Sequence, residues 1–298
     1  MCLPVPGHRS GDQAPGSSGS PAPSAQRLFD GTRLLHPILF QLGDLPVPAF
    51  GVLLAAGFVL GTVWTLMLAR SRGIPPRVIE NLCGAALLGG LIGARALDVL
   101  VHRGAYREEP WRALYIWEGG AALLGGLGGA LLLGWIVLAR MRQPLGPAAD
   151  VVTPGLFLGL AIGSLGSLLA GDDFGRPAAV AWAIRFPDLE GSKMAYPLLD
   201  VPLHPTQIYH AAIALSIFAL ASLFLKWRRR APGQVFALAL LLYAGGRFVL
   251  DDFRGDDVAR GYFGPYSTSQ WLCLGLAPAS LLLLVAAGVF GRRRGSPA

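Results

Sequence analysis

Two arginine–carboxylate pairs lie within segments of the chain that are otherwise apolar. Arg95 is followed by Asp98 three residues later and Arg247 by Asp251 four residues later, so each pair shares one face of a helix. An Arg or Asp at the centre of a membrane helix costs at least about 2.5 kcal/mol, and such residues commonly mark functional sites. Self-neutralisation and function explain the Arg95 pair equally well. For Arg247 a functional role is favoured over simple neutralisation by Asp251, because further charged residues follow it as far as Arg254.

A second polar group gathers where a long polar segment gives way to an apolar one. His204 and Gln207 are followed there by Tyr209 and His210. A lone histidine is more often structural than catalytic, but these neighbours make a role in proton transfer more plausible. The sequence has no HxxxH pair, Cys/His cluster, Walker loop or Gly-x-Ser-x-Gly motif. Metal, nucleotide and serine-hydrolase chemistry are therefore not favoured, and we expect no cofactor and no metal site.

Glycines recur at helical spacing in two of the apolar segments. One segment holds Gly119, Gly120, Gly125, Gly126, Gly128 and Gly129, and the other holds Gly155, Gly159, Gly163 and Gly166. Small residues at such spacing are typical of close helix packing in membranes. Paired glycines also let backbone N–H groups approach an anionic ligand, although a glycine pattern alone is weak evidence for such a site.

The composition decides the class of protein that must position these residues. Only 14% of the 298 residues are charged, against about 25% in a typical soluble protein, and 53% are hydrophobic. The mean hydropathy is +0.51. Three cysteines are too few for a disulfide-stapled domain. A net charge of +7 could indicate nucleic acid, but in a membrane protein the position of the basic residues matters more, and we expect no nucleic acid partner.

The sequence predicts an all-α integral membrane protein with seven transmembrane helices and a small extracytoplasmic arm. The seven-helix domain covers residues 29–290, after a disordered leader at 1–28 that is rich in Pro, Gly and Ser. A basic cytoplasmic tail follows at 291–298. The predicted spans are at about residues 48–69, 82–101, 114–139, 150–170, 206–225, 233–250 and 270–290.

Basic residues gather between alternate spans and at the carboxyl end, which predicts the orientation. They lie at 70–77, 140–142, 226–230 and 292–294. By the positive-inside rule, the amino terminus is outside and the carboxyl terminus is cytoplasmic. The outer arm spans residues 171–205 and contains five prolines and several aromatic residues. Long loops in compact proteins are often functional, so we expect the function at or near the outer leaflet.

Three ordered motifs resemble the prolipoprotein diacylglyceryl transferase family. They are the run from Pro202 to Tyr209, the residues Gly246–Phe248 followed by Asp252–Arg254, and the run from Ser267 to Trp271. The resemblance covers about residues 48–275. It implies a bacterial inner-membrane enzyme that moves the diacylglyceryl group of phosphatidylglycerol to the lipobox cysteine thiol of a prolipoprotein and releases glycerol phosphate. Phosphatidylglycerol, the lipobox peptide and membrane lipid are the implied partners.

The resemblance also implies roles for individual residues. Arg247 holds the phosphate, because a guanidinium suits an anionic phosphodiester. Asp251 orients Arg247 and stands where the family has glutamate. His204 is the implied catalytic base, with His210 as the alternative. The implied substrate-binding residues are Arg95, Gly119, Gly120, Gly126, Ser164, Ser167, Asp172, Gly175, Arg176, Gln207 and Arg254.

Several family positions are replaced. Leu124 stands where the family has histidine, Ser164 and Ser167 stand for an arginine and an asparagine, and Phe50 stands for a tyrosine. One interpretation is an active transferase with a rearranged site. The alternative is a diverged, catalytically impaired relative that binds phospholipid or lipoprotein. A transporter is the least favoured interpretation, because no repeated half is visible in the sequence.

Overall fold

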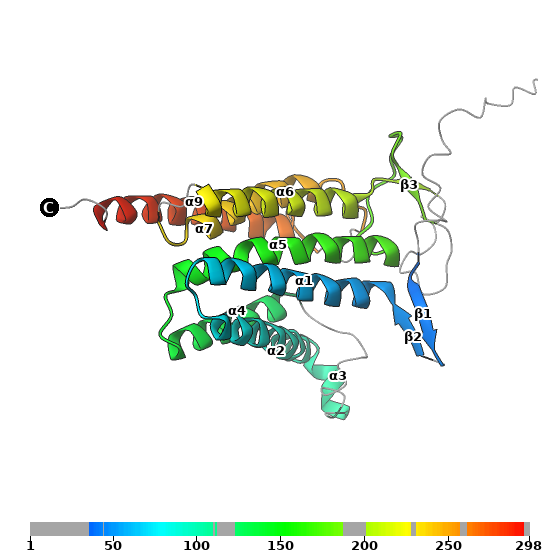
Figure 1. The fold of residues 1–298 in the computed structure, drawn as a ribbon. Helices are drawn as coiled ribbons and strands as arrows, with labels where there is room; N and C mark the ends of the chain where they lie inside the picture. Colours follow the sequence, from blue (N-terminus) through cyan, green and yellow to red (C-terminus); the bar gives the residue numbers. More distant parts are fainter. Residues whose placement is uncertain are drawn as a thin grey trace, which may run out of the picture.

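The computed structural model describes residues 36–43, 45–109, 111, 123–186, 201–227, 231–256 and 261–294. The predicted leader at 1–28 lies outside these ranges. Within them the chain is mostly helical, which confirms an all-α membrane protein. Six helices are long and apolar enough to cross a bilayer (Figure 1). They are α1 (Ala49–Ser71), α2 (Pro76–Val101), α5 (Leu145–Ala170), α6 (Thr206–Trp227), α7 (Gln234–Asp251) and α9 (Thr268–Arg294).

The predicted span at 114–139 corresponds to the shorter apolar helix α4 (Leu123–Arg140). Residues 114–122 lie outside the described ranges, so a count of seven spans stays a prediction. Helix α2 begins six residues before its predicted span, because Pro76 occupies its first turn and Pro75 precedes it. Helix α5 similarly begins directly after Pro144. Helix α9 continues to Arg294, so residues 291–294 of the predicted tail prolong a helix.

Helix α5 is the centre of the bundle. In its apolar 18-residue stretch, 56% is buried inside the protein, whereas the corresponding share for α9 is 11%. It packs against α1, α6 and α7, while α7 also packs against α9. Its contact with α1 is a close one through glycines, since a Cβ on Gly61 would collide with the carbonyl of Gly155. The buried carboxylate of Asp150 accepts hydrogen bonds from the backbone of Gly233 and Phe236, which fixes the start of α7 against α5.

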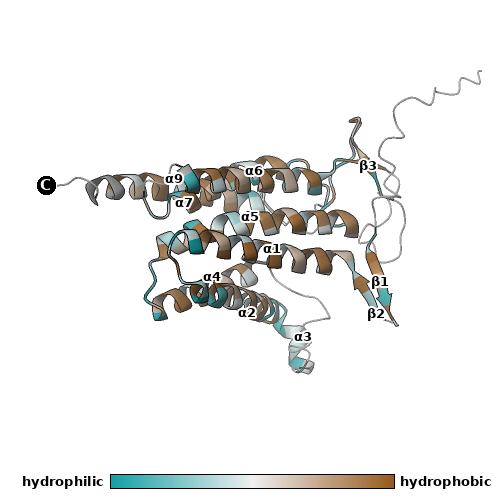
Figure 2. Ribbon diagram, in the orientation of Figure 1, coloured by the Kyte–Doolittle hydropathy of each residue, from teal (hydrophilic) through white to brown (hydrophobic). Residues whose placement is uncertain are grey.

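Helices α2 and α4 form a second closely packed pair. The backbones of Gly89 and Gly93 on α2 meet those of Gly125 and Gly129 on α4, with no room for a Cβ between them. The glycine spacing seen in the sequence is therefore used for helix packing here. Hydropathy colouring shows apolar residues along the helices and polar ones mainly near their ends (Figure 2).

Short antiparallel strand pairs and one short helix accompany the long helices in the described residues. Strand β1 (Ile38–Leu42) pairs with β2 (Leu45–Pro48), β3 (Ile184–Arg185) with β4 (Pro202–Leu203), and β5 (Tyr262–Phe263) with β6 (Tyr266–Ser267). Helix α3 (Arg103–Glu108) follows α2. In Figure 1 the β1–β2 hairpin, α3 and β3 lie at one end of the bundle, and α9 ends at the other. The described arm residues, 171–186 and 201–205, include β3 and β4.

The α2–α4 contact predicts opposite effects for two neighbouring glycines. Gly129→Ala would force a methyl group into the backbone of Gly89 and should destabilise the protein by about 1–3 kcal/mol. Gly128→Ala is the matched control, because its Cβ would meet nothing within 4 Å and alanine favours the helix. Melting temperatures in detergent measure both. Equal effects of the two substitutions would contradict this packing.

Candidate functional site

The end of α5 turns the chain into the arm. Gly171 adopts a left-handed conformation, with φ of 68°, and its N–H donates to the carbonyl of Leu168 at 3.2 Å. The arm then crosses the ends of α6 and α7. Gly175 pairs with Arg254 in an isolated antiparallel bridge, and a Cβ on Gly175 would collide with the backbone of His204. A glycine is required there because three backbone segments meet.

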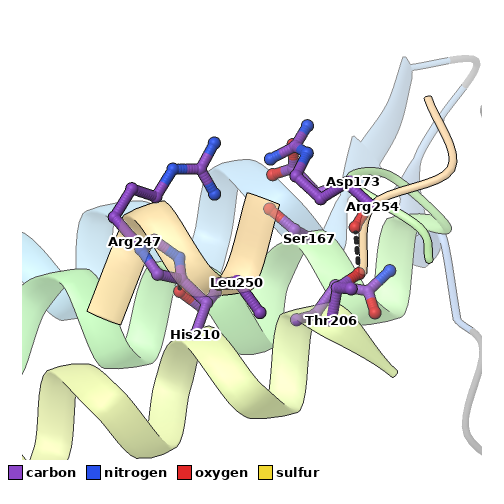
Figure 3. Close-up of a pocket in the computed structure, with 9 residues that line it drawn as sticks. Ser167, Asp173, Thr206, His210, Arg247, Leu250 and Arg254 are labelled. Atoms are coloured by element: carbon purple, nitrogen blue, oxygen red, sulfur yellow. Dashed lines mark hydrogen bonds and ion pairs between the residues drawn. The ribbon is translucent and has the colours of Figure 1, made fainter. Parts of the chain in front are cut away.

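A narrow polar pocket lies where α5, α6 and α7 meet the arm (Figure 3). Arg247 from α7, His210 from α6 and two α5 serines contribute side chains to it. The lining residues are Ser164, Ser167, Asp173, Thr206, Gln207, His210, Arg247, Leu250 and Arg254. Six of these were predicted from the sequence: Ser164, Ser167, Gln207, Arg247 and Arg254 as site residues, and His210 as the alternative base.

Arg247 faces the pocket and is only loosely paired with its carboxylate neighbour. The nearest Arg247 nitrogen lies 3.5 Å from Asp251 Oδ1, longer than the roughly 2.7–2.9 Å of a charge-assisted hydrogen bond. The Asp251 carboxylate is fully buried and is held mainly by two hydroxyl groups. Ser269 Oγ donates to Oδ1 at 2.5 Å, and Ser267 Oγ donates to Oδ2. The acceptors of Asp251 are thus satisfied while the guanidinium still points to the pocket.

Arg254 is, in contrast, matched by two carboxylates. It donates to Asp173 at 2.6 Å and, through Nε, to Asp256 at 2.9 Å. Burial alone would raise the pKa of Asp173, but the Arg254 guanidinium outweighs that effect, so this pKa lies below its usual 3.8. Arg176, which is exposed, donates to the Arg254 carbonyl at 3.1 Å. These contacts join the arm to the end of α7.

The two candidate histidines have different surroundings. His210 lines the pocket, where Nδ1 lies 3.0 Å from Ser164 Oγ and Nε2 lies 3.5 Å from the Tyr243 hydroxyl. His204 lies beside the pocket and is not among its lining residues. Its ring packs edge-on against Phe253 at 5.1 Å, and its Nδ1 faces the Tyr209 hydroxyl at 3.2 Å.

Two residues at the start of α6 tie that helix to the arm through backbone carbonyls. Thr206 Oγ1 donates to the carbonyl of Asp173 at 2.6 Å, and Gln207 Nε2 donates to that of Asp172 at 2.6 Å. Asp172 Oδ1 in turn accepts from the Asp173 N–H at 3.0 Å. Three predicted residues therefore support the wall of the pocket without lining it: Asp172, Gly175 and Arg176.

The remaining predicted residues lie elsewhere or outside the described ranges. Arg95 pairs with Asp98 at 3.5 Å and stacks over the ring of Tyr106, in a cluster at the α2–α3 junction that does not line the pocket. Gly126 packs against Gly90 of α2. Gly119 and Gly120 are not described, and neither is the Leu124 side chain. Phe50 lies against Gly166 of α5.

Some residues around the pocket were not among the predicted site residues. Asp173, Thr206 and Leu250 line it, Tyr243 contacts His210, and Ser267 and Ser269 hold Asp251. The serines belong to a motif that the sequence analysis did single out, and Tyr243 lies one helical turn before Arg247. Within the described ranges, no group of three His, Cys, Asp or Glu side chains is arranged to hold a metal ion.

Fold and site together define a multi-pass membrane protein with a guanidinium-lined pocket at one end of its helices, a geometry suited to an anionic headgroup. The sequence matches one family profile, described as prolipoprotein diacylglyceryl transferase, over residues 37–286. The chain belongs to this family, which confirms the resemblance. It is accordingly a multi-pass protein of the bacterial inner membrane.

Three relatives are named phosphatidylglycerol–prolipoprotein diacylglyceryl transferase. That of Gloeobacter violaceus is 31% identical over 240 residues, covering 80% of this chain and 87% of the relative. That of Geobacter sulfurreducens is 30% identical over 270 residues, covering 88% and 98%. That of Azoarcus sp. is 32% identical over 259 residues, covering 83% and 93%.

The Asp173–Arg254 contact predicts a pH-dependent stability. The pKa of Asp173 is lower in the folded state than its usual 3.8. The charged carboxylate therefore stabilises the fold fully above pH 3.8, and this stabilisation is lost as the pH falls through the lower folded-state pKa. Asp173→Asn should cost about 1 kcal/mol or less at pH 7, since 44% of this side chain is exposed, and less at pH 3. Melting in detergent at both pH values measures this. Glu80→Gln, an exposed carboxylate on α2, is the control, and an Asp173→Asn effect that does not shrink at pH 3 would contradict the assignment.

Proposed function

We propose that the chain transfers the diacylglyceryl group of phosphatidylglycerol to the lipobox cysteine thiol of a prolipoprotein. Its family and the names of its relatives support this activity. The observation that carries the proposal is the direction of Arg247, which lines the pocket instead of being closed off by Asp251. A guanidinium so placed can donate two parallel hydrogen bonds to a phosphate.

The chemistry requires a base, a nucleophile and a stabilised leaving group. The thiol loses its proton, the sulfur forms a C–S bond to the diacylglyceryl carbon, and the C–O bond to the phosphate breaks. Negative charge then accumulates on the departing glycerol phosphate, where Arg247 stabilises it. Asp251 orients Arg247 and is itself fixed by the hydroxyls of Ser267 and Ser269.

Of the two candidate bases, His210 has the more direct access to the pocket. It lines the same space as Arg247, whereas His204 contacts the aromatic rings beside it. We assign His210 to accept the thiol proton, with Ser164 and Tyr243 orienting its ring. His204 keeps a role in positioning, because its backbone N–H donates to the Arg176 carbonyl at 3.0 Å and so links two segments of the arm.

One observation favours the alternative of a lipid-binding relative. The second pocket guanidinium, Arg254, already binds Asp173 and Asp256, and serines occupy the replaced family positions 164 and 167. The family arginine that Ser164 replaces would lie on α5. Without it, phosphate binding depends mainly on Arg247. In this alternative the protein retains phosphatidylglycerol without transferring its diacylglyceryl group.

We further propose that the arm and the β1–β2 hairpin lie outside the cytoplasm. The basic clusters lie at or just after the carboxyl ends of α1, α4, α6 and α9, and the opposite end of the bundle carries the pocket. The positive-inside rule then places the amino terminus outside. The pocket would open near the outer leaflet, where a prolipoprotein arrives after crossing the membrane.

The transferase proposal predicts a large loss on Arg247→Ala. Membranes containing the protein, phosphatidylglycerol and a lipobox peptide should yield a thioether-linked diacylglyceryl peptide, detected by mass spectrometry. Arg247→Ala should lower the rate by about 100-fold or more, because the charge on the leaving phosphate loses its partner. Arg140→Ala, at the other end of the bundle, controls for loss of a basic residue. No product from the unaltered protein above empty membranes would overturn the transferase and leave the lipid-binding alternative.

The proposed orientation predicts the behaviour of two carboxyl-terminal fusions. Green fluorescent protein attached after residue 298 should fluoresce, because it folds in the cytoplasm, whereas alkaline phosphatase attached there should be inactive. Fusion of the phosphatase within residues 187–200 of the arm should give activity. The opposite pattern would show that the chain is inverted.

A further inference from the structure

Gln207 lines the pocket and has a buried hydrogen-bond acceptor that no described residue uses. Its side chain is 2% exposed and lies in the first turn of α6. Nε2 donates to the carbonyl of Asp172 at 2.6 Å, which fixes the orientation of the amide because two carbonyl oxygens would repel each other there. Oε1 is buried and has no hydrogen-bond partner among the described residues.

A buried acceptor without a partner is uncommon and costly in a folded protein. The neighbouring hydroxyls do not supply the missing donor, since Ser164 Oγ donates to the Leu160 carbonyl and Thr206 Oγ1 to the Asp173 carbonyl. The same pocket holds the Arg247 guanidinium, so a ligand whose phosphate meets Arg247 places its headgroup among these polar side chains. Gln207 Oε1 therefore suits a donor carried by that headgroup.

We propose that Gln207 Oε1 accepts a hydrogen bond from a hydroxyl of the terminal glycerol of phosphatidylglycerol, which makes Gln207 a specificity-determining residue. This inference rests on the proposed function. The ester and phosphate oxygens of the lipid are acceptors only, and the two headgroup hydroxyls are its donors. A site that binds a substrate hydroxyl rejects an analogue without it, because the buried protein group then stays unpaired.

Phosphatidyl-n-propanol is the appropriate probe, because its headgroup has three carbons and the same phosphodiester charge but no hydroxyl. Proteoliposomes containing either lipid are supplied with a lipobox peptide, and kcat/KM is measured for each lipid. The unaltered protein should prefer phosphatidylglycerol by about tenfold or more. Gln207→Met, which removes the acceptor at similar volume, should reduce this preference to less than about threefold. A purely structural role would lower the rate with both lipids and leave their ratio unchanged.

The matched control is Gln234→Met. Gln234 is also a buried glutamine at a helix start, but its Oε1 already accepts from the Ala231 N–H at 3.0 Å. This substitution should leave the lipid preference unchanged. Equal use of both lipids by the unaltered protein would overturn the inference even if Gln207→Met fails to fold.

Retention of the two lipids by the detergent-purified protein, measured by native mass spectrometry, separates this inference from the transferase proposal. Preferential retention of phosphatidylglycerol that Gln207→Met abolishes would support headgroup recognition without any turnover. Transfer that shows no preference between the lipids would sustain the transferase and overturn the role of Gln207. Equal retention together with absent transfer would overturn both.

Discussion

The buried Asp251 carboxylate is the constraint on which the geometry of the pocket depends. A carboxylate with no solvent exposure must be fully hydrogen-bonded to remain charged among apolar helices. Ser267 at the end of β6 and Ser269 in the first turn of α9 meet most of that requirement, and Arg247 completes it at longer range. Because the hydroxyls carry the close contacts, the guanidinium can be oriented by Asp251 and still offer its N–H groups to a ligand.

The arm depends on a second set of charges at the end of the same helix. Arg254 contacts Asp173 and Asp256 and pairs through its backbone with Gly175. These contacts hold the arm across the ends of α6 and α7 and form one wall of the pocket. Two of the arginines that the sequence analysis singled out therefore have different roles: Arg247 faces the pocket, and Arg254 fixes its wall.

The sequence predicted those parts of the structure that depend on local spacing. Arg247 and Asp251 had to share a helical face, and apolar length located the six spans. Contacts between distant residues could not be predicted in this way. Ser164 meets His210 across 46 residues, and Asp173 meets Arg254 across 81, because both depend on how α5 packs and where Gly171 turns the chain. The starts of α2 at Pro76 and of α5 at Leu145 were missed. Prolines favour a helix start at these positions, several residues before the apolar stretch from which the spans were predicted.

The charges around the pocket explain why hydrogen-bond geometry must dominate ligand binding. Two guanidiniums face three carboxylates, those of Asp251, Asp173 and Asp256, so the cluster offers no net positive charge to an anionic lipid. Attraction must come from donors that point at the phosphate while the carboxylates are turned towards other partners. Asp251 is turned towards two serines and the other two carboxylates towards Arg254.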